Sequence, residues 1–169
     1  LNTKPGEIMN AAGSSEMVSV LVDRPVPNPE YYLRNTAIPG IWQVYATTAG
    51  DFAVEWFYEQ FCQDMSKDQF YGEFMATAID TYLDDTSVSF APYLSGDRQS
   101  IEFKTASWQG LTLGTTRGQM LVAVLKAMNG VLKKAIDQAS ELVTLSGVMK
   151  ISGGLQNEAY DRLKAHIIP

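Results

Sequence analysis

The hydrophobic positions of the chain follow two different periods. Before Gly50 they gather in short runs rich in β-branched and aromatic residues, which is typical of strands. The predicted strands cover residues 7–9, 17–22, 31–33 and 42–47. Small residues at 11–15 and the Pro39-Gly40 pair predict turns, and three prolines predict a surface loop over 24–29. This half of the chain therefore predicts pairs of strands.

After Gly50 the apolar residues recur at three- and four-residue steps, which indicates helices. The predicted helices run from about 52 to 64, 68 to 83, 120 to 136 and 157 to 167. Thr115 and Thr116 are candidate caps for the third of these. Pro and Gly predict a loop over 90–98, and residues 148–152 predict a short strand. The sum is an α/β domain with a mixed sheet flanked by helices.

Composition narrows the class of protein. The chain has 169 residues, 46% of them hydrophobic and 19% charged, which suits one domain with a sizeable core. Its net charge of −6 leaves no global basic field, so we expect neither nucleic acid nor a membrane as a partner. The chain begins at Leu1 and ends in an apolar Ile167-Ile168-Pro169 stretch, which favours a piece of a larger protein.

Single residues exclude several chemistries. Cys62 is the only cysteine, so an intrachain disulfide is impossible, and a reducing, cytoplasmic location is expected. His166 is the only histidine, which leaves almost no material for a His/Cys zinc site, a Cys-His dyad or a serine triad. No pair of carboxylates stands in a context that marks it as catalytic.

Small turns at the ends of predicted strands are candidate phosphate sites, because backbone amides there are free to meet an anion. Gly13-Ser14-Ser15 supplies amides and hydroxyls without bulk, although a plain hairpin turn explains it equally well. Glu16 argues against an anion at this turn unless its side chain points to the opposite face.

Gly153-Gly154 forms a second turn of this kind. It can admit a purine ring against the backbone, and the alternative is a tight strand-to-helix turn. Asn157 either binds a ribose or base or caps the last helix, and the spacing favours capping. Asp97 beside Arg98 is either a contact between domains or a solvated surface pair, and the second is favoured. We assign Trp42, Trp56 and Trp108 to packing rather than ligand stacking.

Taken in order, these segments resemble the carboxy-terminal half of the FGGY carbohydrate kinases, a family that includes glycerol kinase and xylulokinase. The most specific match is Phe90-Ala91-Pro92-Tyr93-Leu94-Ser95-Gly96-Asp97-Arg98, which is similar to the signature Phe-x-Pro-Tyr-Leu-x-Gly-Glu-Arg. The other matching segments are Pro5-Gly6-Glu7 with Gly13-Ser14-Ser15, Ala49-Gly50 through Trp56-Phe57, Gly110-Leu111, Lys126 to Gly130, and Ile151 to Asn157.

The resemblance implies an actin-like (ribonuclease H-like) ATPase domain that closes with an amino-terminal partner domain on ATP, magnesium and a sugar or polyol. It implies that residues 1–169 are the carboxy-terminal domain, incomplete at both ends, without the amino-terminal sugar-binding domain. The residues expected to bind the nucleotide are Gly13, Ser14 and Ser15 at the phosphates, and Gly50, Gly153, Gly154, Leu155 and Asn157 at the nucleoside.

The resemblance also implies that the catalytic aspartate lies upstream of Leu1, so neither Asp23 nor Asp51 is a candidate. The expected function is phosphorylation of a ketose or polyol hydroxyl by the full-length protein, the fragment alone being inactive. Ser14, Asp97, Asn129 and Leu155 depart from the family pattern. The Ser14 and Asp97 replacements keep the chemistry, whereas Asn129 and Leu155 leave room for a catalytically silent sugar or nucleotide sensor or assembly module. A plain structural domain is a third reading. The identity of the sugar and homo-oligomer formation stay open.

Overall fold

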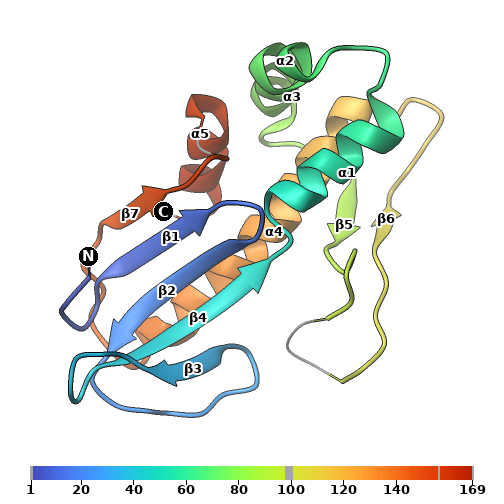
Figure 1. Cartoon of the computed structure of the whole chain (residues 1–169). Coiled ribbons are helices and arrows are strands. Elements are labelled where there is room, and N and C mark those ends of the chain that lie inside the picture. The colour runs from blue at the N-terminus through green and yellow to red at the C-terminus, as the bar shows by residue number, and fades with distance from the viewer. Residues whose placement is uncertain (1, 98–100, 156, 169) are drawn as a thin grey trace.

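A five-stranded sheet combines four strands from the amino-terminal part of the chain with one strand from its carboxy-terminal part (Figure 1). The computed structural model describes residues 2–97, 101–155 and 157–168, so the expectations placed on Arg98 and Gln156 lie outside the described residues. The strands are β1 (Ile8–Ala12), β2 (Glu16–Val22), β3 (Tyr32–Asn35), β4 (Trp42–Thr48) and β7 (Met149–Ser152), in the order β3-β4-β2-β1-β7. Only the β1–β7 pair is parallel.

The β1–β2 hairpin differs from the prediction at its turn. β1 continues through Ala12, which is fully buried and pairs with Glu16, so the turn is confined to residues 13–15. The prediction that the turn begins at residue 11 is wrong, because small alanines also suit an inward-facing strand position in a close-packed core. The shorter turn places Gly13 directly at the edge of the sheet.

The described residues form five α-helices and one π segment, and among these helices the longest packs extensively on the sheet (Figure 1). Their bounds are α1 (Asp51–Phe61), α2 (Lys67–Gln69), η1 (Phe70–Phe74), α3 (Met75–Tyr82), α4 (Arg117–Ser140) and α5 (Glu158–Ile167). Thr116 caps α4 in a capping box with Gln119, which confirms one of the two predicted caps. The cap therefore defines where α4 begins, and this longest helix packs against β2 and β4.

Two local predictions fail for tertiary reasons. The single helix expected over 68–83 is interrupted by η1, where the backbone N–H of Met75 bonds to the carbonyl of Phe70. The loop expected over 90–98 begins in a small hairpin, since β5 (Ser89–Ala91) pairs with β6 (Ser107–Gln109). Strands of three residues joined by a long connection leave no periodic signal in the sequence.

Aromatic packing joins this hairpin to α1. Trp56 stacks on Trp108 with ring centroids 5.8 Å apart, and Phe90 lies 4.8 Å from Trp108. The packing role predicted for these tryptophans is therefore confirmed. One hydrophobic cluster lies among the helices and the hairpin, and a second lies between the sheet and α4. Among the helices that the structure describes, none combines the length and apolar character of a membrane span.

Candidate nucleotide site

Four strand ends meet at one edge of the sheet. β1 ends at Ala12, β2 begins at Glu16, β4 ends at Thr48 and β7 ends at Ser152, and the strand directions place these ends side by side. The segments that follow them carry all eight residues predicted to bind a nucleotide. The fold therefore brings the 13–15 turn, Gly50 and the 153–157 segment to a common edge.

The start of α1 holds the 13–15 turn by its carbonyl groups. The backbone N–H of Asp51 donates to the Gly13 carbonyl at 3.0 Å, and that of Phe52 donates to the Ser14 carbonyl at 3.2 Å. Gly50 makes this approach feasible, because a Cβ atom there would stand 2.5 Å from the Glu16 nitrogen and 2.7 Å from the Gly13 oxygen. Its φ of +55° also favours glycine.

The same contacts orient two amides toward solvent. In a trans peptide the C=O and N–H point in opposite directions. Because the carbonyls of Gly13 and Ser14 face α1, the N–H groups of Ser14 and Ser15 face away from it. Among the described residues neither amide has a partner, and both residues are exposed. Two adjacent outward amides with two hydroxyls form an arrangement suited to an anion.

The second glycine turn rests on the end of β1. Gly153 has a φ of +121°, and a Cβ there would lie 2.1 Å from the Ala12 carbonyl oxygen. The N–H of Leu155 donates to this same oxygen at 3.0 Å. Gly154 is different, because no atom lies within 4 Å of the position of its missing Cβ. The backbone conformation and the close contact with Ala12 therefore require glycine at 153, whereas Gly154 borders open space.

A cleft of about 580 Å³ opens beside Gly154. Its lining residues are Asp51, Glu55, Asp68, Tyr71, Gly72, Gly154, Leu155 and Asn157. The Tyr71 hydroxyl donates to Asp51 at 3.1 Å and lies 3.2 Å from Glu55. Burial, and then the Asp51 carboxylate, raise the pKa of Tyr71, so this phenol stays neutral. The cleft thus offers carboxylates, hydroxyls and glycine backbone.

Two predicted residues of this cleft also have structural roles. The Asn157 side chain accepts a hydrogen bond from the Tyr160 N–H at 2.9 Å, which confirms the capping interpretation. Asn157 nevertheless lines the cleft. Leu155 is only 5% exposed and belongs to the core.

Glu16 points away from the solvent-facing amides. Its carboxylate is fully buried, accepts from Lys164 at 2.6 Å and from Tyr160 at 2.6 Å. The charge that argued against an anion at the 13–15 turn is therefore neutralised inside the core. Sequence reasoning missed this ion pair, although Lys164 occupies an inward helix position with Tyr160 and Leu163.

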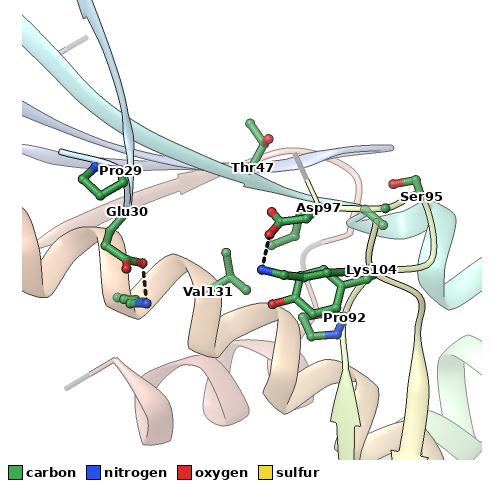
Figure 2. A pocket seen from close by; sticks show the side chains of 13 residues that line it. Pro29, Glu30, Thr47, Pro92, Ser95, Asp97, Lys104 and Val131 are labelled. Atoms are coloured by element: carbon green, nitrogen blue, oxygen red, sulfur yellow. Dashed lines mark hydrogen bonds and ion pairs between the residues drawn. The ribbon is translucent and has the colours of Figure 1, made fainter. Parts of the chain in front are cut away.

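A second cavity, of about 370 Å³, is lined in part by the end of β4 and Ala49, directly before Gly50 (Figure 2). Its lining includes Lys104 and most of the segment that resembles the family signature, namely Pro92, Tyr93, Ser95, Gly96 and Asp97. Lys104 donates to Asp97 at 2.7 Å, and Lys134 pairs with Glu30 across the cavity wall. Arg98 lies outside the described residues, so the predicted Asp97–Arg98 pair stays a prediction, and Asp97 accepts a hydrogen bond from Lys104.

Metal ligands are sparse in the parts of the chain that the structure describes. No group of three or more His, Cys, Asp or Glu side chains there is arranged to hold a metal ion. Glu55, which borders the cleft, is paired with Lys67. The described side chains therefore offer no cage of their own for a cation.

No family model matches the chain, and no curated protein matches it in sequence. Solved structures, in contrast, match its fold. A xylulose kinase from Rhodospirillum rubrum superposes with a TM-score of 0.81 at 19% identity, over 96% of this chain and 33% of that one. A gluconate kinase from Lactobacillus acidophilus gives 0.77 at 20% identity, over 95% and 33%.

A Plasmodium falciparum glycerol kinase, solved with ADP, gives a TM-score of 0.76 at 16% identity, over 96% of this chain and 33% of that one. The chain thus spans about a third of the length of the structures it matches. The resemblance found in the sequence is confirmed at the level of the fold. The chain has the actin-like ATPase fold of these sugar kinases, a mixed sheet flanked by helices.

Proposed function

We propose that this chain supplies most of the nucleotide site of an ATP-dependent kinase that phosphorylates a hydroxyl of a ketose or polyol. The observation that carries the proposal is the pair of outward, unpartnered amides of Ser14 and Ser15 at the shared strand edge. The fold shared with xylulose, glycerol and gluconate kinases supports it.

In this proposal the 13–15 turn binds the β- and γ-phosphates. The amides of Ser14 and Ser15 donate to phosphate oxygens, and their hydroxyls donate further bonds. Gly13 has no side chain to block a phosphate from the turn. A Cβ atom added there would meet only the Ser15 oxygen, at 3.7 Å, so the space beside it is open. The carbonyls tied to α1 keep these donors in place before ATP binds, which favours catalysis by fixed dipoles.

The nucleoside lies in the cleft beside Gly154 in this proposal. Gly154 admits a flat ring against the backbone, since the position of its missing Cβ is open. Leu155 supplies an apolar wall, whereas Asp51 and Glu55 can accept from ribose hydroxyls or an exocyclic amine. The acidic wall disfavours an isolated anion, so we expect the phosphates to extend from the cleft toward Ser14.

Two parts of the reaction lie beyond the described side chains. When magnesium is bound with ATP, it neutralises phosphate charge, and we expect phosphate oxygens and water to hold it. The general base toward the sugar hydroxyl is proposed to come from an aspartate upstream of Leu1, in an amino-terminal domain. Closure of that domain would exclude water as a competing acceptor.

The experiment is ADP release by the intact protein with magnesium and ATP against a panel of ketoses, aldoses and polyols. We expect one compound to raise ADP release far above the rate with water alone. Replacing the upstream aspartate with asparagine serves as the control and should abolish that stimulation.

If no compound of the panel raised ADP release, the proposed kinase activity would be contradicted. If ATP still raised the melting temperature, a nucleotide sensor would replace it. If ATP gave no shift, the nucleotide site itself would be excluded.

A further inference from the structure

An ion pair is buried directly behind the 13–15 turn. Glu16 and Lys164 have side chains that are 0% and 1% exposed, and their charged atoms lie 2.6 Å apart. The surrounding residues form the larger hydrophobic cluster of the molecule. Moving two charges out of water into such a core is expensive, so this pair calls for a physical reason.

The pair belongs to a hydrogen-bonded cluster that joins the sheet, α4 and α5. Lys164 also donates to Asn10 of β1 at 2.5 Å, and Tyr160 donates to the second Glu16 oxygen at 2.6 Å. Asn129 of α4 donates to the Tyr160 hydroxyl at 3.0 Å. Burial, and then the Glu16 carboxylate, raise the pKa of Tyr160 well above its usual value, so its hydroxyl remains a donor.

The cluster connects the two parts of the candidate nucleotide site, the 13–15 turn and the cleft beside Gly154. Glu16 is the residue after Ser15, so the bonds to its carboxylate act one residue away from the turn that carries the outward amides. Tyr160 and Lys164 lie on α5, whose cap Asn157 lines the cleft. Directional bonds from α5 to Glu16 therefore set the distance between the turn and the cleft.

Stability alone does not explain such a pair. Apolar residues of similar volume often serve a core equally well, whereas a charged pair with fixed hydrogen bonds selects one arrangement of its elements. We propose that Glu16, Tyr160 and Lys164 are positioning residues that hold the 13–15 turn and α5 in the relative placement needed to bind both ends of ATP. This inference rests on the proposed function.

The test replaces the charges while keeping the core filled. The double variant Glu16→Leu with Lys164→Met leaves no unpaired charge, but the Tyr160 hydroxyl and the Asn10 amide oxygen each lose one buried partner. We therefore expect a folded protein whose melting temperature falls by about 5 to 10 °C. In the intact protein we expect KM for ATP to rise about tenfold and kcat to fall, with KM for the sugar unchanged. We also expect faster amide hydrogen exchange in peptides that cover residues 13–16.

A matched control uses the same helix. Arg162→Met removes an exposed ion pair to Asp80, whose charged atoms lie 2.7 Å apart, and should change neither the ATP kinetics nor the exchange of the turn. The double variant and the wild type are compared at temperatures equally far below their own melting temperatures. If the variant then kept ATP kinetics within about twofold and wild-type exchange, the inference would be overturned.

The inference can also be tested if the double variant does not fold or if the wild type binds no ADP. If the double variant does not fold, Tyr160→Phe removes one bond to Glu16 and keeps the ring, and we expect KM for ATP to rise about threefold with KM for the sugar unchanged. An unchanged KM for ATP in that variant overturns the inference. If the wild type binds no ADP and shows no turnover, the proposed function fails, and amide exchange of the turn alone then decides whether the cluster positions it.

Discussion

Two layers of glycine at the candidate site can be compared directly. The inner layer, Gly50 and Gly153, has positive φ values and Cβ positions that collide with backbone atoms at 2.5 Å and 2.1 Å. The outer layer, Gly13 and Gly154, has no such collision, and Gly154 has no neighbour within 4 Å. The inner glycines are explained by the chain itself. The outer glycines have no such need within the chain, and in the proposed function their open positions admit the nucleotide.

The largest effect is expected in the inner layer. Gly153→Ala and Gly50→Ala each force a left-handed φ on alanine and push its methyl group into backbone, so we expect a loss of about 3 kcal/mol or more of unfolding free energy. Denaturant unfolding of the intact protein measures this change. A wild-type midpoint for either variant would remove the distinction between the layers.

Gly13→Ala should separate binding from stability. The added methyl meets only the Ser15 oxygen at 3.7 Å, so the melting temperature should be unchanged or slightly higher. Because the methyl stands where phosphate must approach, we expect KM for ATP to rise about tenfold, or about 1.4 kcal/mol. Gly130→Ala is the matched control, since its Cβ position in α4 is also open and lies outside the predicted nucleotide site. Equal kinetics in the two variants would count against the phosphate role of the turn.

Asn157→Ala combines a structural and a binding effect of intermediate size. Loss of the α5 cap should lower the unfolding free energy by about 1 kcal/mol, and loss of the amide from the cleft should weaken ADP binding a few-fold. Thr116→Ala removes the cap of α4 at similar expense and leaves the cleft intact. Calorimetric titration with ADP compares the two, and an equal weakening of binding in both would assign the whole effect to stability.

Gly154→Ala should give the smallest effect. Its methyl enters open space at the cleft, so stability is retained and only the nucleoside end of the ligand is hindered. We expect adenosine binding to weaken by about two- to threefold, measured by titration followed by NMR. Tighter binding would show that the cleft has room that the nucleoside does not use.

Sequence patterns predicted the elements that local chemistry determines. The α4 helix carries its own apolar stripe and its Thr116 cap, and β2 is rich in valine and other apolar residues. The 13–15 and 153–154 turns were located by their glycines. These signals work because each depends on residues that are close in sequence.

Other features depend on residues far apart in the chain. The β5–β6 hairpin is held by Phe90 against Trp108, and no local period marks it. The hydrogen bond from Tyr71 to Asp51 in the cleft forms only when η1 packs beside α1. The Glu16–Lys164 pair joins residues 148 positions apart. Such contacts are set by tertiary packing, so single-residue patterns give at most a hint of them.

The most direct test of the account is a comparison of ADP and adenosine binding to the wild type and to Gly13→Ala, by titration of the intact protein in the presence of magnesium. The account assigns the 13–15 turn to the phosphates and the 154–157 cleft to the nucleoside. It therefore predicts that Gly13→Ala weakens ADP about tenfold and leaves adenosine within about twofold of the wild type. Equal weakening of both ligands, or no binding of ADP to the wild type, would contradict it.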